Sequence, residues 1–342
     1  LGNHCLSLKE YKTAKKAFQY VVGLGEDSDF YFSAYVKSLE TTFTEVQENS
    51  NLDKSEYLQA VNDFEKALNT FGRDRSTIRL ILQKSQIQAF FLDSASFAIK
   101  ELEDALNFPG LTDKLRAEIK MQLADILVLK GDIWEASLLF MQIDKDFKFE
   151  PIGHEAKFKN ARIYYYDGEF EFAQSQLNVL KESTSKLIAN NAMELSLLIT
   201  ENYGLDSNYQ AMFWFASAEL LIEKHQFKEA YSLMDSITIN FPYHSLSDEI
   251  FLKKAKVELS QGNIEKAIGF LEKIMKYHSQ DILADDALFL LGDIYQNKLL
   301  DKEKASEVYK KILFDYKGSL HVVEARKRYR YLRGDKTVVE EK

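Results

Sequence analysis

The stretch Leu288–Ile312, "LFLLGDIYQNKLLDKEKASEVYKKI", decides the fold of this chain. Gly292 and Ala305 stand inside its apolar stripes, where a helix that faces a core normally carries leucine. Tyr309 and Ile312 follow Ala305 at spacings that put all three residues on one face of a helix. The stretch therefore predicts two helices that cross closely, because a small side chain lets two backbones approach each other.

The pattern Ala-x-x-x-large-x-x-apolar recurs along the whole chain. Successive alanines of the pattern are separated by 46, 38, 38, 37, 57, 37 and 38 residues. A fixed period of this size is typical of solenoids, in which stacked helical hairpins bury faces that one hairpin cannot bury alone. The triplets are Ala14/Phe18/Val21, Ala60/Phe64/Ala67, Ala98/Leu102/Ala105, Ala136/Phe140/Ile143, Ala173/Leu177/Leu180, Ala230/Met234/Ile237, Ala267/Leu271/Ile274 and Ala305/Tyr309/Ile312.

A partner helix precedes most of these triplets, and the two are joined by a tight turn that carries Gly131, Gly168 or Gly262. The gap of 57 residues leaves room for an inserted helix near residues 186–202. The gap of 46 residues predicts a long turn near residues 48–53. With only three prolines in 342 residues and no sustained apolar-polar alternation, the chain is predicted to be all-α.

Composition argues against several classes of function. A net charge of −9 disfavours a nucleic-acid binder, which needs a basic face. No apolar run reaches the ~18 residues of a membrane-spanning helix. One cysteine and six histidines without metal-ligand spacing predict no metal site and no cofactor. We also expect no small-molecule substrate.

The repeat resembles the tetratricopeptide repeat. The likeness lies in the second-helix alanines, the turn glycines and the small residues of the first helices, which are Gly2, Ala124, Ala161, Ala218, Ala255 and Gly292. It implies a right-handed α-solenoid of about eight hairpins over residues 1–318, a C-terminal capping helix over 319–335 and a charged tail over 336–342. Leu1 and Gly2 match the middle of a first helix, so we expect an incomplete first repeat and a longer parent protein.

The C-terminal segment carries a narrower resemblance. "DDALFLLGDIY" (285–295) and "DYKGS" (315–319) are similar to the ends of long tetratricopeptide proteins of Bacteroidota-type bacteria and to envelope-assembly tetratricopeptide lipoproteins. Lys317 stands where those lipoproteins usually carry proline. This resemblance implies a periplasmic or outer-membrane-associated protein in an assembly or secretion complex.

The family likeness also implies a partner-binding groove on the concave side. The groove positions carried over to this chain are Phe158, Arg162, Tyr165, Tyr166, Met212, Phe215, Glu219, Leu252, Lys256, Phe289 and Asp293. If exposed, the aromatic members would form an interaction strip rimmed by charge. The alternative is that these aromatic side chains belong to the core.

A basic cluster marks the C-terminal helix. Its members are Arg326, Lys327, Arg328, Arg330 and Arg333. Cations near the end of a helix complement its dipole, and a terminal helix needs a polar outer face. Docking on an acidic partner is the alternative role.

The leading functional hypothesis is a non-catalytic scaffold that binds a peptide or helix of a partner protein. Two alternatives stay open: an architectural subunit that associates with itself, and an enzyme built on a helical-repeat scaffold. The enzyme would need acids or a nucleophile with a base converging in one cleft, and the sequence shows no such constellation.

Overall fold

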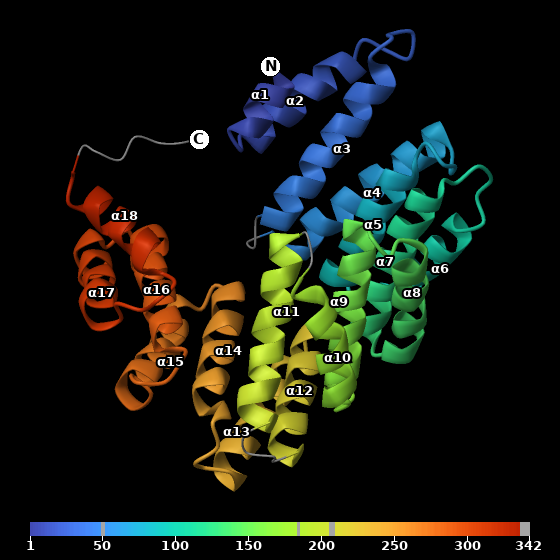
Figure 1. Cartoon of the computed structure of the whole chain (residues 1–342). Coiled ribbons are helices and arrows are strands. Elements are labelled where there is room, and N and C mark those ends of the chain that lie inside the picture. Colours follow the sequence, from blue (N-terminus) through green and yellow to red (C-terminus); the bar gives the residue numbers. More distant parts are fainter. Residues whose placement is uncertain (49–51, 183–184, 205–208, 336–342) are drawn as a thin grey trace. The chain divides into compact units, whose positions relative to one another are not determined.

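The computed structural model describes residues 1–48, 52–182, 185–204 and 209–335. Over these residues the secondary structure is helix and turn, without a strand, and successive helices form hairpins (Figure 1). The all-α solenoid class predicted from the sequence is confirmed. No helix of the described part combines the length and apolar character needed to cross a bilayer.

The helices fall into the eight predicted pairs. They are α1 (Gly2–Ser7) with α2 (Tyr11–Val22), α3 (Tyr31–Glu48) with α4 (Lys54–Phe71), α5 (Ile78–Phe91) with α6 (Ala95–Ala105), α7 (Asp113–Lys130) with α8 (Ile133–Asp146), α9 (Pro151–Tyr166) with α10 (Phe170–Leu180), α12 (Tyr209–Glu223) with α13 (Phe227–Asn240), α14 (Leu246–Ser260) with α15 (Ile264–Tyr277), and α16 (Ala284–Asp293) with α17 (Lys302–Asp315).

Two described helices stand outside the pairs. The first, α11 (Lys186–Ile199), runs into a π-helical turn, η1 (Thr200–Gly204), and occupies the place of the expected insertion. The second, α18 (Val322–Leu332), packs on α17 as the last described helix. Another π-helical turn, η2 (Ile294–Lys298), continues α16. Residues 49–51 of the long turn expected near 48–53, and the charged tail at 336–342, lie outside the described residues.

The chain forms two compact units. Unit 1 comprises Leu1–Thr200 with Glu219–Gln226, and unit 2 comprises Glu201–Ala218 with Phe227–Lys342. The boundary falls within α12, so the two ends of that helix belong to different units. One continuous solenoid over residues 1–318 stays a prediction, and each unit is described by itself.

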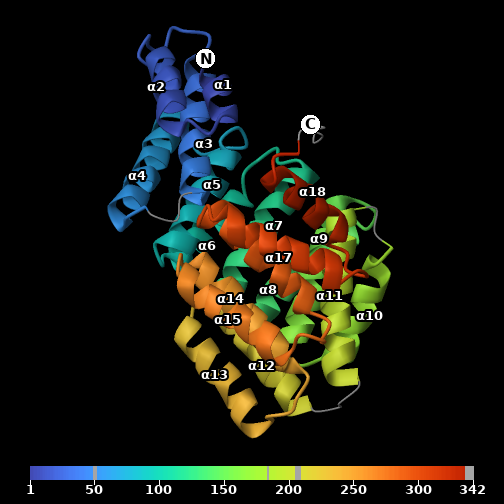
Figure 2. The same cartoon turned by 90° about the vertical axis from the view of Figure 1, so that its left-hand side faces the viewer.

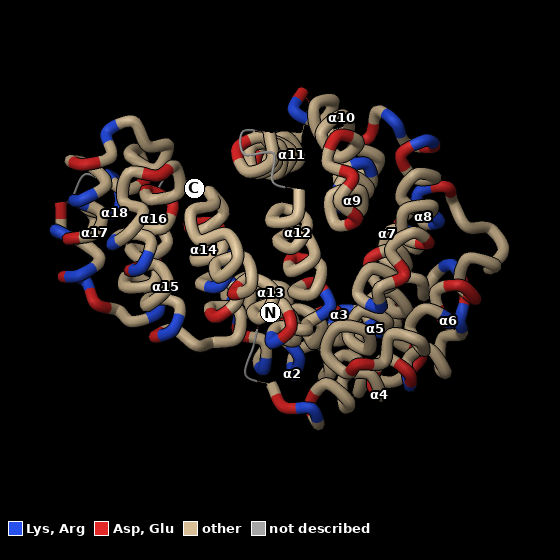
Figure 3. The backbone as a smooth tube through the Cα atoms, turned by 90° about the horizontal axis from the view of Figure 1, so that it is seen from below, with Lys and Arg blue, Asp and Glu red and all other residues tan. Residues whose placement is uncertain are grey.

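Unit 1 places its paired helices in two layers. Figure 3 shows α5, α7 and α9 on its inner side, and α6, α8 and α10 on its outer side. The turn after α7 uses Gly131 at φ 101°, and the Gly131 N–H donates to the carbonyl oxygen of Leu127 at 2.9 Å. A left-handed residue that ends a helix in this way suits glycine, which has no Cβ to clash.

Buried small residues make the close helix crossings that the sequence predicted. Ala98, Ala136 and Ala173 in unit 1, like Ala267 and Ala305 in unit 2, have no solvent exposure. Around Ala305, the core of unit 2 joins Leu288, Leu291, Tyr309 and Ile312 with side chains of α14, α15 and α18. Figure 1 shows α14 to α18 following one another as stacked helices, and Figure 2 shows α14, α15, α17 and α18 of this series from another side.

Gly292 is the tightest of these notches in unit 2. A Cβ added at Gly292 would lie 2.6 Å from Cε1 of Tyr309, a fully buried ring. We expect Gly292→Ala to lower the free energy of unfolding by about 1–2 kcal/mol, because overpacking outweighs the better helix propensity of alanine.

A double-mutant cycle measured by urea unfolding checks the cause. In a Tyr309→Leu background, which lacks the ring, Gly292→Ala should cost clearly less than in the native chain. Equal costs in both backgrounds would show that the ring does not determine the requirement for glycine.

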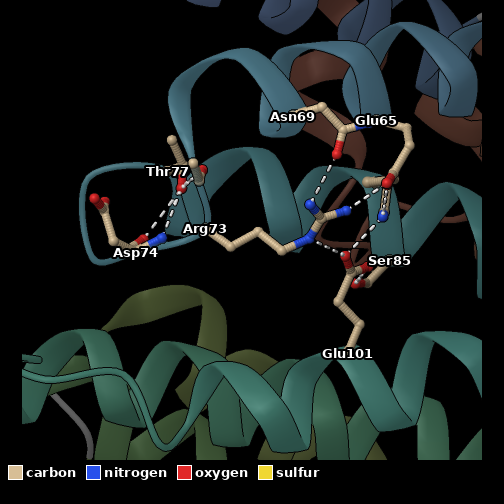
Figure 4. A network of polar contacts seen from close by, with 9 residues as sticks. Glu65, Asn69, Arg73, Asp74, Thr77, Ser85 and Glu101 are labelled. Carbon is tan, nitrogen blue, oxygen red and sulfur yellow. Dashed lines mark hydrogen bonds and ion pairs between the residues drawn. The ribbon is translucent and has the colours of Figure 1, made fainter.

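An ionic network centred on the buried Lys84 joins three helices of unit 1. Lys84 on α5 is 5% exposed, and its Nζ lies 2.6 Å from carboxylate oxygens of both Glu65 on α4 and Glu101 on α6. Arg73 pairs with Glu65 as well, and Ser85 donates to Glu101 (Figure 4). Every charge in the network therefore has an opposite charge beside it, which is the condition for burying such groups.

Candidate partner-binding surface

A recess of about 230 Å³ opens in unit 1 between the first helices of successive hairpins. It is lined by Phe90, Asp125, Val128, Leu129, Phe140, Lys159, Arg162, Ile163, Tyr166 and Glu223. Its walls come from α5, α7, α8 and α9, with Glu223 from the end of α12. Apolar walls with a few charged groups are the usual composition of a binding site.

The charges of the recess are arranged as neighbouring pairs. The Nζ of Lys159 lies 2.6 Å from a carboxylate oxygen of Asp125 and 3.4 Å from one of Glu155. Arg162 donates both to Glu223 and to the hydroxyl of Tyr166. These contacts fix the side chains before any partner arrives.

The same surroundings shift the protonation equilibria. Burial raises the pKa of Asp125, and the nearby Lys159 offsets this only in part. Burial works against the charge of Arg162, but Tyr166 and Glu223 outweigh it, so the pKa of Arg162 lies above its ordinary value. Burial also raises the pKa of Tyr166 above its ordinary value. The recess thus offers fixed charges of both signs.

The repeat register explains how the chain positions these charges. Asp125, Arg162 and Glu219 each follow the small residue of a first helix, namely Ala124, Ala161 and Ala218. Arg162, Glu219 and Glu223 occupy groove places that the family likeness implies, whereas Asp125 and Lys159 were not predicted. Asp125 could have been predicted from the sequence, because it occupies the same repeat position as Arg162 and Glu219, directly after the small residue.

The predicted strip of exposed groove aromatics is not what the structure shows. Five of the predicted groove residues are at most 6% exposed, namely Tyr165, Tyr166, Met212, Phe215 and Leu252. The physical reason is clearest at two of them. The hydroxyl of Tyr165 donates to Glu219 at 2.6 Å, and Leu252 belongs to the core of unit 2. For Tyr165, Met212, Phe215 and Leu252 the core alternative was the right one, whereas Tyr166, although 4% exposed, also lines the recess.

The remaining predicted groove residues are accessible to different degrees. Lys256 is exposed, whereas Phe158, Arg162, Glu219, Phe289 and Asp293 are partly buried. In unit 2, Phe289 stacks on His321 with ring centroids 4.3 Å apart, and Asp293 accepts from Arg328 at 2.6 Å. Phe289 and Asp293 therefore already serve the packing of α16 against the C-terminal helix.

The basic cluster of α18 divides into two parts. Arg328 is a structural residue, since it donates to Asp293, to Glu324 and to the hydroxyl of the buried Tyr309. The other four members, Arg326, Lys327, Arg330 and Arg333, are exposed. At Arg328 the structural role holds, because its guanidinium is engaged within unit 2, and docking stays an alternative for the four exposed members.

Comparisons with known proteins agree with this architecture. The family model for the tetratricopeptide repeat protein 21 ARM repeat matches residues 199–312. A search of curated protein sequences finds no significant match.

Two solved structures illustrate the structural likenesses. A tetratricopeptide repeat protein from Parabacteroides merdae is 13% identical, with 87% of this chain and 98% of that chain covered and a TM-score of 0.36. A monomeric mutant of IFIT1 with m7Gppp-AAAA is 15% identical, with 96% and 70% covered and a TM-score of 0.35. Neither likeness bears on function. The family match over residues 199–312 and the recurring hairpins with their buried small-residue notches support a repeat protein of the tetratricopeptide type.

Proposed function

We propose that this chain is a non-catalytic scaffold that holds a peptide or helix of a partner protein against the inner side of unit 1. Tetratricopeptide-type repeats are generally protein-interaction modules, which supports the class of function. The observation that carries the proposal is the recess, where apolar walls surround fixed charges of both signs. A partner segment that contributes an apolar side chain and flanking charges suits such a surface.

Preorganisation is the proposed source of affinity. The pairs Asp125–Lys159 and Arg162–Glu223 hold their side chains in place, so the scaffold loses little conformational entropy when the partner binds. The same pairing disfavours catalysis at this site, because a general acid or base needs a group free to exchange protons with a substrate. We propose a protein partner rather than a nucleic acid, in keeping with the net charge of −9. An envelope-assembly complex, which the sequence resemblance implies, is the first place to seek it.

Photo-crosslinking in native extract tests the proposal. A photoreactive phenylalanine analogue replaces Leu129, which lines the recess, or in a matched control Phe97, an exposed residue on α6 outside it. We expect a crosslinked protein from position 129 and none from position 97, with at least a tenfold loss of product when Arg162→Glu is added. The proposal would be contradicted by equal crosslinking at both positions, or by a yield at position 129 that Arg162→Glu leaves unchanged.

A further inference from the structure

An exposed aromatic surface runs along one edge of unit 1, outside the recess. Tyr164 of α9 bridges Trp134 of α8 and Phe172 of α10, with ring centroids 5.8 and 5.9 Å apart. Trp134 is 47% exposed, Phe172 61%, and Leu138, one helical turn after Trp134, 60%. We call Trp134, Leu138, Tyr164 and Phe172 the aromatic edge. Contiguous exposed apolar side chains of this size are typical of an interaction surface.

Exposed acidic residues flank members of the aromatic edge in sequence. Glu135 adjoins Trp134 in sequence, Glu171 adjoins Phe172, and Glu169 precedes α10 by one residue, and all three are exposed. The nearest lysine in sequence, Lys130, is paired with Asp132 at 2.8 Å. Neither α10 nor the first half of α8 contains a lysine or arginine. An apolar surface rimmed by carboxylates fits a helix that presents both cations and apolar side chains.

The chain itself presents such a helix in unit 2. Arg326, Arg330 and Arg333 recur at spacings of four and three residues, which puts them on one face of α18. We call these three residues the basic stripe. Val323, 77% exposed and three residues before Arg326, adds apolar surface beside it. Arg328 is held inside unit 2, so it keeps α18 in place while the stripe faces solvent.

We propose that this chain associates head to tail, with the basic stripe of α18 in one copy docked on the aromatic edge of unit 1 in a second copy. Two copies that each carry a net charge of −9 repel each other in most orientations. The basic helix of one copy is attracted to an acidic surface of the other, which favours this one orientation. The two surfaces differ and lie on different units, which makes the contact heterologous and able to continue from copy to copy. This association goes beyond the proposed peptide binding and uses none of the recess residues.

Sedimentation velocity over a wide concentration range tests the association. We expect the average mass of the native chain to rise with concentration, and the rise to weaken as salt is added. Arg326→Glu/Arg330→Glu/Arg333→Glu, the tail variant, should remain monomeric. So should Trp134→Ser/Phe172→Ser, the edge variant, whose replaced side chains are exposed and therefore leave the core intact.

Two combinations make the test specific. An equimolar mixture of the tail and edge variants should stop at the dimer, since it contains one working stripe and one working edge. Adding Glu135→Lys/Glu169→Lys/Glu171→Lys to the tail variant reverses the charge of both surfaces. The average mass of this variant should again rise with concentration. Any of three results would overturn the proposal. The native chain could stay monomeric at all concentrations, the mixture could contain no dimer, or the charge reversals could fail to restore association.

Discussion

Replacing Gly153 with alanine is expected to lower the free energy of unfolding by about 3 kcal/mol. Gly153 is buried in the first turn of α9, just after Pro151. A Cβ at this position would lie 2.0 Å from the carbonyl oxygen of Phe147 and 2.6 Å from its carbonyl carbon. These are backbone atoms in the short connection from α8, so the helices themselves would have to move. That cost exceeds the roughly 1 kcal/mol that alanine gains over glycine in a helix.

Gly269→Ala provides the matched control. Gly269 lies within α15, where an added Cβ would meet no atom within 4 Å. Relief of glycine's backbone entropy should therefore stabilise unit 2 by about 0.5–1 kcal/mol. Urea unfolding followed by circular dichroism measures both variants. A Gly153→Ala protein as stable as the native chain would show that the α8–α9 connection adjusts freely.

Lys84→Met should destabilise unit 1 by about 3 kcal/mol. Methionine keeps the length and apolar stem of the side chain but removes the cation between Glu65 and Glu101. Two partly buried carboxylates then share only Arg73, and uncompensated buried charge is costly. Lys66→Met, which removes the solvent-exposed pair with Asp63, should change stability by less than about 0.5 kcal/mol. If both variants change the free energy of unfolding by similar amounts, burial of Lys84 does not increase the contribution of its ion pairs to stability.

The stability difference between the native chain and Lys84→Met should depend on pH. Burial tends to raise the pKa of Glu65, but hydrogen bonds from Lys84 and Arg73 outweigh it and hold that pKa below its usual 4.5. A carboxyl with a lowered folded-state pKa stabilises the fold above its unfolded pKa and loses this contribution as the pH falls through the folded value. The difference should therefore shrink below pH 4.5. A constant difference down to strong acid would contradict this linkage.

The candidate surfaces were only partly predictable from the sequence. The family resemblance implied Arg162 and Glu219 as groove residues, because one place in each first helix recurs at a fixed distance from the small residue. It could not separate Tyr165, which is buried and donates to Glu219, from a ligand-facing aromatic. The basic helix was recognisable from its composition, but the engagement of Arg328 by Asp293 and Tyr309 requires two segments that lie far apart in sequence.

The sequence by itself determined the repeat: the all-helical class, the pairing of helices and the places of the inserted and terminal helices. These follow from local spacing, since small and large residues at helical intervals prescribe which faces meet. Only the tertiary structure decided which of those faces remain accessible. Burial depends on the next hairpin, and on close approaches such as Gly153 to Phe147, and neither is encoded in the spacing of any single helix.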